Sequence, residues 1–230
     1  MISIICSSNR PHLWKEFISN FKNTNKFIEI IFVGPIKPNF KLPQNYTFIL
    51  SKYKPVQCIA IGIKQAKSPY FLIAADDLFI KKKLNLALYL EKSIQFYKKK
   101  QLLSPRYFLN NEDFSEGLKF HPNDDFYLPI FNIFSKEDYT VLEGFDINFI
   151  GILYEVDFYL RAIQKLKFKV TFSNLIELHE NNQTQNKKGN LSKDLWVTDR
   201  RTLEYLWEKK NKKYFRKKMV EPYIFENIDT

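Results

Sequence analysis

The chain has 230 residues, of which 45% are hydrophobic, and it carries a formal net charge of +11 at pH 7. This length and apolar content suffice for one domain with a substantial core, which excludes a disordered or fibrous protein. The first apolar run has no basic leader, and nowhere do 18 uncharged apolar residues follow one another. We therefore expect a soluble protein without a signal peptide or a membrane span. Two cysteines inside apolar stretches favour buried thiols in a reducing, cytoplasmic compartment.

The positive charge indicates an anionic partner, and nucleic acid, acidic lipid headgroups and a phosphorylated small substrate all qualify. Much of the excess lies in residues 81–83, 98–100 and 209–218. The sequence shows no dedicated nucleic-acid module and no zinc-ligand spacing. The basic, aromatic C-terminus is compatible with peripheral contact to the cytoplasmic face of a membrane.

The first hundred residues alternate short β-like runs with helical stretches, which predicts an α/β fold with a mostly parallel central sheet flanked by helices. Strands are expected at 2–6, 27–33, 46–50 and 70–75, and helices at 11–22, 55–66 and 83–99. A long loop with a short strand is expected over 104–127. Further predicted elements are a strand at 128–134, a short helix capped by Ser135, a helix from Tyr154, strands at 168–172 and 175–178, and a helix from about Thr198.

Two adjacent acids, Asp76 and Asp77, come directly after the apolar strand at 70–75. Ligands of open α/β sheets gather at the carboxyl ends of the strands, so these carboxylates are expected to meet a substrate. Paired carboxylates suit a hard divalent cation that takes its remaining ligands from water and from a bound diphosphate. Adjacent acids that cap a helix or face solvent are the alternative interpretation.

A second acidic segment contains Glu155, Asp157 and Arg161. Residues two apart on a helix diverge by about 200° around its axis, so Glu155 and Asp157 cannot both face one site. Glu155 and Asp157 are the candidate catalytic residues. Because Asp157 and Arg161 have the spacing of a helical ion pair, Glu155 rather than Asp157 is expected to be the general base. Acids that merely complement the helix dipole would explain the segment without catalysis.

His179 follows a predicted strand and precedes a polar segment. A histidine at a strand end can complete a metal site or contact a phosphate, although a lone histidine is also an ordinary surface residue.

Taken in order, these segments resemble the GT-A-fold glycosyltransferases, particularly the inverting enzymes of family 2. The resemblance covers nearly the whole chain. The matching segments are Ser7-Ser8-Asn9-Arg10-Pro11 after the first strand, the strand at 29–33, residues 57–77 with the acid pair, Gly144-Phe145-Asp146, residues 155–161 and His179.

The resemblance implies a single Rossmann-like GT-A domain over 1–230, with a nucleotide-binding half (1–100), an acceptor-binding and catalytic half (101–195) and a C-terminal basic helix (196–230). It implies transfer of a hexosyl group from a nucleotide-diphosphate sugar, expected to be a UDP-sugar, to a hydroxyl of a glycan or lipid-linked acceptor, with inversion. The residues implied to contact the nucleotide are Ser7, Ser8, Asn9, Arg10, Gly34, Gln57 and Asp76. Those implied to hold Mn²⁺ or Mg²⁺ are Asp76, Asp77 and His179.

The sequence departs from the family pattern at two places. Gly34 and Pro35 stand where an acid often grips the nucleobase, and Ala74 or Ala75 stands at the first acid of an Asp-x-Asp motif. These departures leave an inactive relative as one alternative hypothesis. The positive charge leaves a protein that binds nucleic acid or another anion as the other.

Overall fold

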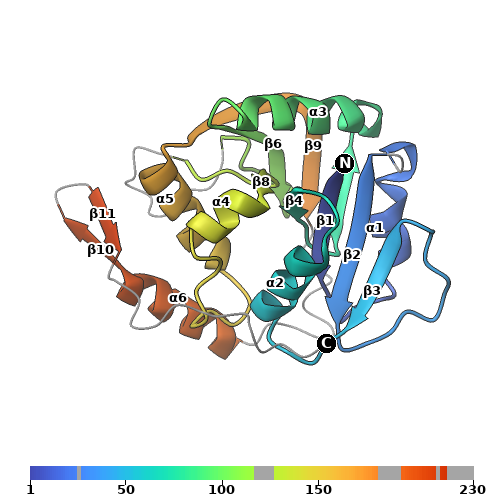
Figure 1. Ribbon diagram of the computed structural model, residues 1–230, viewed down its shortest axis with the longest axis horizontal. Helices are drawn as coiled ribbons and strands as arrows, with labels where there is room; N and C mark the ends of the chain where they lie inside the picture. The colour runs from blue at the N-terminus through green and yellow to red at the C-terminus, as the bar shows by residue number, and fades with distance from the viewer. Residues whose placement is uncertain (25–26, 117–126, 181–192, 211–212, 217–230) are drawn as a thin grey trace.

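The computed structural model describes residues 1–24, 27–116, 127–180, 193–210 and 213–216. Figure 1 shows a mixed α/β structure in which helices surround two main sheets. Within the described ranges, no helix combines the length and the apolar character needed to cross a membrane.

The central sheet has five strands in the order β3 (Tyr46–Leu50), β2 (Ile28–Gly34), β1 (Ile2–Ser7), β4 (Tyr70–Ile73) and β8 (Ile133–Ser135). The first four strands run parallel and lie where the sequence predicted them. β8 pairs antiparallel with β4, so the expected mostly parallel sheet is a mixed sheet. The predicted strand at 128–134 is shortened to β8.

The parallel strands are covered on both faces because apolar side chains point to each side of β1. Ile5 packs in a core cluster with the helix α2 (Pro55–Gln65). Ile4 and Cys6, on the opposite face, pack in a second cluster with α1 (Trp14–Ser19) and α3 (Leu86–Tyr97). Such double burial is what a continuous apolar strand predicts. Two 3₁₀ turns, Lys22–Thr24 and Lys83–Asn85, follow α1 and precede α3.

The second sheet has the order β5 (Leu78–Lys81), β9 (Lys169–Glu180), β6 (Gln101–Leu109) and β7 (Glu112–Asp113). The segment 104–127 was expected to be a long loop with a short strand. The strand β6 occupies its start and begins earlier, at Gln101, and residues 117–126 lie outside the described part. The two strands expected at 168–178 form one continuous strand, β9, whose register with β6 shifts between Pro105 and Arg106.

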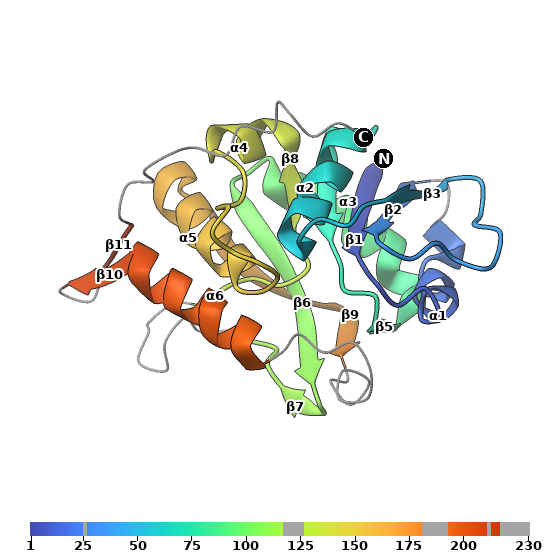
Figure 2. The ribbon, with the colours of Figure 1, turned by 90° about the horizontal axis from the view of Figure 1, so that it is seen from below.

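The remaining helices come from the C-terminal half of the sequence. Ser135 caps α4 (Lys136–Val141) by accepting the Asp138 backbone N–H, as predicted. α5 (Tyr154–Leu166) follows, and α6 (Lys193–Leu206) lies beside it, as Figure 2 shows. The predicted C-terminal helix ends at Leu206, and β10 (Trp207–Lys210) and β11 (Lys213–Arg216) follow it as an antiparallel pair. Residues 217–230 lie outside the described part.

Candidate active site

A pocket of about 570 Å³ lies at the carboxyl ends of the parallel strands. Residues 7–10 after β1 and residues 73–78 around the end of β4 form one side of it. The start of α2, the segment 128–131, the loop 151–153 and the first turn of α5 form the other side, and β6 and β9 contribute Tyr107 and Glu180. The pocket therefore occupies the edge where open α/β sheets bind their ligands.

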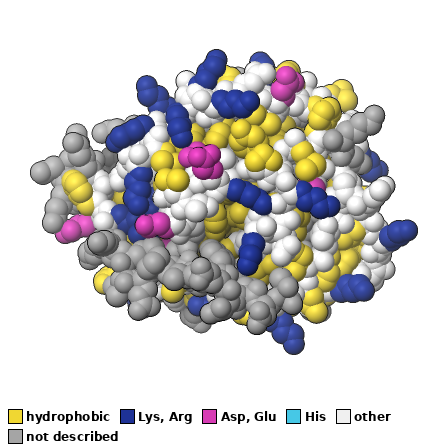
Figure 3. Space-filling view, in the orientation of Figure 1, with side chains coloured by type: hydrophobic (Ala, Val, Ile, Leu, Met, Phe, Trp, Pro, Cys, Tyr) yellow, Lys and Arg dark blue, Asp and Glu magenta, His cyan; other side chains and the backbone are white. Residues whose placement is uncertain are grey.

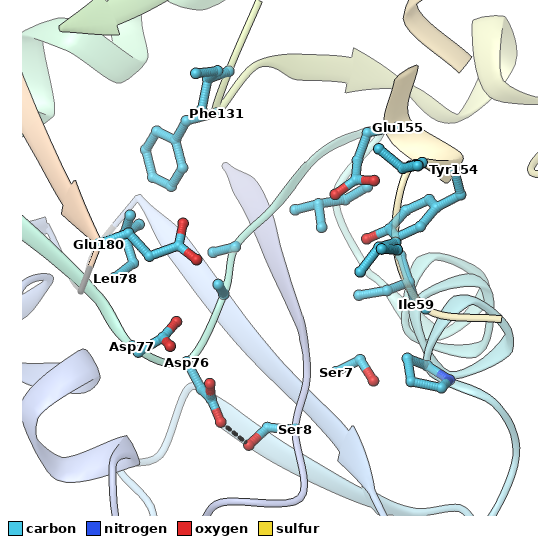
Figure 4. A pocket seen from close by; sticks show the side chains of 18 of the residues that line it. Ser7, Ser8, Ile59, Asp76, Asp77, Leu78, Phe131, Tyr154, Glu155 and Glu180 are labelled. Carbon is cyan, nitrogen blue, oxygen red and sulfur yellow. Dashed lines mark hydrogen bonds between the residues drawn. The ribbon is translucent and has the colours of Figure 1, made fainter. Parts of the chain in front are cut away.

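Asp76 and Asp77 both line this pocket, and Arg10 bridges them. The Asp76 carboxylate accepts hydrogen bonds from the Ser8 hydroxyl and from Arg10, whose Nε lies 3.1 Å from Oδ2. Figure 4 shows the Ser8 bond. The Asp77 Oδ2 lies 3.1 Å from Arg10 Nη2. Burial raises the pKa of Asp76, and the hydrogen bonds from Arg10 and Ser8 oppose this shift only in part.

One carboxylate oxygen of the acid pair is available to a ligand. The Asp77 side chain is 5% exposed. Its buried Oδ1 has no hydrogen-bond partner among the described residues. An unpaired buried carboxylate oxygen is costly unless a cation or donor reaches it.

No group of three His, Cys, Asp or Glu side chains within the described ranges converges into a ready-made metal site. The two carboxylates nevertheless fit Mg²⁺ or Mn²⁺, which retain water and bind through one or two carboxylates plus substrate phosphates.

Four of the six other residues expected at the nucleotide, Ser7, Ser8, Asn9 and Arg10, line the pocket. Gly34 does not line it: a Cβ on this glycine would lie 1.9 Å from the Ser8 carbonyl oxygen, so its role is close backbone packing behind Ser8. Gln57 does not line it either, because its side chain accepts the Lys54 backbone N–H at 3.1 Å and caps α2.

Glu155 and Asp157 diverge as the helix geometry predicted. Glu155 lies in the first turn of α5, and its carboxylate faces the pocket (Figure 4). Burial, followed by the nearby carboxylates of Glu180 and Asp199, raises the pKa of Glu155 from 4.5 to about 7. A carboxylate with this proton affinity is suited to accept a proton near neutral pH.

Asp157 is completely buried away from the pocket. Its Oδ2 accepts bonds from Nε and Nη2 of Arg161 at 2.9 and 2.7 Å. Its Oδ1 accepts bonds from Trp207 Nε1 at 2.9 Å and from Arg216 Nε at 2.7 Å. With both oxygens engaged by these donors, Asp157 is structural, and its place among the candidate catalytic residues is corrected.

The structure does not bring His179 to the pocket. Its ring stacks on Phe108 at 4.6 Å between centroids, and its Nε2 lies 3.6 Å from Glu177. The neighbouring Glu180 points to the other face of β9 and lines the pocket with Asp77 (Figure 4). The Tyr107 hydroxyl donates to Glu180 Oε2 at 2.8 Å. Burial, then the Asp77 carboxylate, raises the pKa of Glu180.

Glu180 could have been found from the sequence. Alternate residues of a strand share a face, and Ile176 and Leu178 are apolar and buried. Glu180 lies on the same face of β9 as these two residues, whereas His179 lies on the opposite face. The strand-end position suggested a site residue correctly, but the alternation assigns that position to the glutamate.

Comparison with known proteins bears on the fold. No protein-family model matches the sequence, and no curated protein matches it either. Two crystal structures of S. aureus TarS are similar. The structure of its residues 1–349 gives a TM-score of 0.55 at 11% identity over 79% of this chain and 60% of that chain. The other gives a TM-score of 0.53 at 12% identity over 80% of this chain and 37% of that chain.

This chain thus spans less than two thirds of the length of either TarS structure. TarS has the GT-A fold of family 2-like glycosyltransferases. At such low identity the likeness bears on architecture and leaves activity open. Together with the strand order, it shows that this chain shares the GT-A fold of TarS.

Proposed function

We propose that this protein is a glycosyltransferase that moves a sugar, expected to be a hexosyl group, from a nucleotide-diphosphate sugar to an acceptor hydroxyl with inversion. The observation that carries the proposal is the arrangement of the pocket within the GT-A fold. Asp76 and Asp77 lie at the end of the central strand β4, and Glu155, with a pKa raised to about 7, faces the same cavity from α5.

The donor would lie on the half of the chain formed by residues 1–100. Residues 7–10 supply hydroxyl, amide and guanidinium groups at the pocket, where the Arg10 guanidinium is paired with Asp76 and Asp77. Tyr53 and Pro35 also line the cavity and supply apolar contacts. Because positions 34 and 35 are glycine and proline rather than an acid, we expect recognition of a UDP nucleobase to depend on hydroxyl groups and backbone atoms.

The transfer itself requires a base and a stabilised leaving group. Glu155 takes the proton from the acceptor hydroxyl while the oxygen forms a bond to the anomeric carbon. The bond from that carbon to the diphosphate oxygen breaks on the opposite side, and the nucleoside diphosphate leaves with the electron pair, so the configuration inverts. Asp76 and Asp77 would hold Mn²⁺ or Mg²⁺, which supplies charge neutralisation to the departing diphosphate when bound.

The acceptor is a glycan or lipid-linked hydroxyl compound in this proposal. A lipid-linked acceptor would agree with peripheral binding to the cytoplasmic face of a membrane through the basic C-terminus, whose last residues lie outside the described part. No specific observation favours nucleic-acid binding: on the face shown in Figure 3, Lys and Arg side chains are spread over the surface, and the described pocket is lined by several carboxylates.

The test begins with a thermal-shift screen of nucleotide sugars with and without Mn²⁺, because a ligand that binds only the folded state raises its stability. A matching donor at about 100 times its Kd should stabilise the protein by about 2.7 kcal/mol. Asp76→Asn should remove the Mn²⁺-dependent part of this gain. Asp113→Asn is the matched control, since Asp113 lies on the exposed strand β7.

With a donor identified, turnover decides the base. Glu155→Gln should lower the rate by roughly 10²- to 10⁴-fold while donor binding persists. Stabilisation by random oligonucleotides but by no nucleotide sugar would overturn the proposal, and retained turnover in Glu155→Gln would remove Glu155 from the mechanism.

A further inference from the structure

The C-terminal helix α6 reaches the wall of the pocket through one buried carboxylate. Asp199 is fully buried. Its Oδ1 accepts the backbone N–H of Ile150 at 2.8 Å, and its Oδ2 accepts those of Gly151 and Ile152 at 2.9 and 2.8 Å. Three charge-assisted bonds to consecutive amides fix the path of that backbone more firmly than neutral bonds would.

The segment held by Asp199 leads directly to Glu155. Gly151 and Ile152 line the pocket, Leu153 has a φ of 60° at the N-cap of α5, and Glu155 stands in the first turn of that helix. The same segment is tied from its other side by a bond from the Val56 N–H of α2 to the Ile150 carbonyl at 3.3 Å. A displacement of this backbone would therefore move the start of α5 and the carboxylate it carries.

A second set of contacts from the C-terminus holds α5 just beyond Glu155. Trp207 on β10 and Arg216 on β11 both donate to Asp157, and Arg216 Nη2 also lies 2.6 Å from Asp146 Oδ2. Glu155 is thus flanked in sequence by two anchored stretches, and both anchors come from α6, β10 and β11, here called the C-terminal unit.

We propose that the C-terminal unit is a positioning element of the active site, in which Asp199 holds the segment 150–152 and thereby places Glu155 in the pocket. This inference rests on the proposed function for the meaning of Glu155, but the contacts that carry it are independent of the substrate. Asp199 does not line the pocket, so it acts on the reaction through the backbone and through its charge.

The proposal has a measurable consequence at Glu155. The charged groups that raise the pKa of Glu155 from neighbouring elements are Glu180 on β9 and Asp199 on α6. Glu155 in turn raises the pKa values of Tyr107 on β6 and of Tyr154 and Tyr159 on its own helix. Removing the negative charge of Asp199 lowers the pKa of Glu155. Loosening the segment 150–152 admits water and lowers it further, so both effects have the same sign.

The experiment is a ¹³C NMR titration of the glutamate side-chain carboxyl carbons in the substrate-free protein, with Glu155→Gln identifying the resonance. In Asp199→Asn, the pKa of Glu155 should move from about 7 toward 4.5. Glu204→Gln is the matched control, because Glu204 is an exposed acid on the same helix, paired with Arg200. It should leave the titration unchanged. Once a donor is known, the acidic limb of the kcat profile of Asp199→Asn should shift to lower pH as well.

A folded Asp199→Asn variant in which Glu155 titrates as in the unsubstituted protein would overturn the inference. If that variant fails to fold, hydrogen exchange of the unsubstituted protein still decides it. The amides of Ile150, Gly151 and Ile152 should be protected together with those of α6, and rapid exchange of the three with α6 intact would also overturn it. If Glu155→Gln loses turnover and the titration of Glu155 is unchanged in Asp199→Asn, the positioning role alone is refuted. Retained turnover would instead refute the role of Glu155 as base.

Discussion

Replacing Glu155 by glutamine should stabilise the protein at alkaline pH but not at acidic pH. Glutamine has nearly the same shape as glutamate and cannot ionise. The folded protein raises the pKa of Glu155 from 4.5 to about 7, chiefly by burial. It therefore binds the proton more tightly than the unfolded chain does, and ionised Glu155 opposes folding.

The size of this effect follows from the two pKa values. Each tenfold change in proton affinity corresponds to about 1.36 kcal/mol, so a rise from 4.5 to about 7 corresponds to a cost of up to about 3 kcal/mol. Below pH 4.5 the carboxyl is protonated in both states, and its contribution to stability is fully present. That contribution is lost as the pH rises through 7. Since the side chain is partly exposed, roughly 2 kcal/mol is the expected gain for Glu155→Gln at pH 8.

Urea unfolding followed by circular dichroism between pH 4.5 and 8.5 measures the difference directly. The other ionisable groups are common to both proteins, so the difference in the free energy of unfolding isolates Glu155. For a domain of this size, about 2 to 4 °C in Tm per kcal/mol makes the change visible by calorimetry as well. The reasoning is refuted if the difference between Glu155→Gln and the unsubstituted protein does not vary with pH.

Three further substitutions test residues that the sequence predicted at the site. Arg10→Ala leaves Asp76 buried without its guanidinium partner and should cost about 3 kcal/mol in urea unfolding, with a smaller loss contradicting a tight ion pair. Gly34→Ala places a Cβ 1.9 Å from the Ser8 carbonyl oxygen and should lower stability by about 3 kcal/mol, unless β2 can shift. His179→Gln should cost about 1 kcal/mol through the lost stacking on Phe108, and Mn²⁺-dependent donor binding in a thermal-shift assay should persist.

The N-terminal half of the fold was predictable because its signals are local. Each parallel strand is a short apolar run that is closed by turn residues, and Pro55 marks the start of α2. The acid pair could be placed at the pocket because its position relative to the strand β4 fixes which edge of the sheet it occupies.

The strand β6 of the second sheet was harder to predict because it violates a usual signal. Pro105 lies inside β6, and proline normally argues against an interior strand. The structure accommodates it where the register with β9 shifts, between Pro105 and Arg106. A shift of this kind is typical of a β-bulge, and it depends on the partner strand rather than on the local sequence.

Asp199 was not predictable from the sequence at all. Its partners are the backbone amides of residues 150–152, about fifty positions earlier in the chain. Backbone amides are common to all residues except proline, so the sequence does not mark these three as partners of an acid. Asp199 itself lies in an ordinary charged stretch of a helix. The spacing of Asp157 and Arg161, by contrast, predicted their ion pair correctly because the helix repeat alone brings them together.

The link between Arg216 and Asp146 provides a last test of whether the strand pair β10–β11 is energetically coupled to the segment that precedes α5. Arg216 Nη2 lies 2.6 Å from Asp146 Oδ2, and the Asp146 side chain is fully buried. Arg216→Ala leaves that carboxylate without its cation and should cost about 3 to 5 kcal/mol, whereas Asp146→Asn weakens the pair from the other side. If the two residues are coupled, the double variant should be more stable than the sum of the single losses predicts by about 1 to 3 kcal/mol in urea unfolding. Additive losses would mean that β11 docks without recognising this carboxylate, and its contact with α5 would then come from other bonds, among them those from Arg216 to Asp157 and from Gln164 Nε2 to the Tyr214 carbonyl at 3.0 Å.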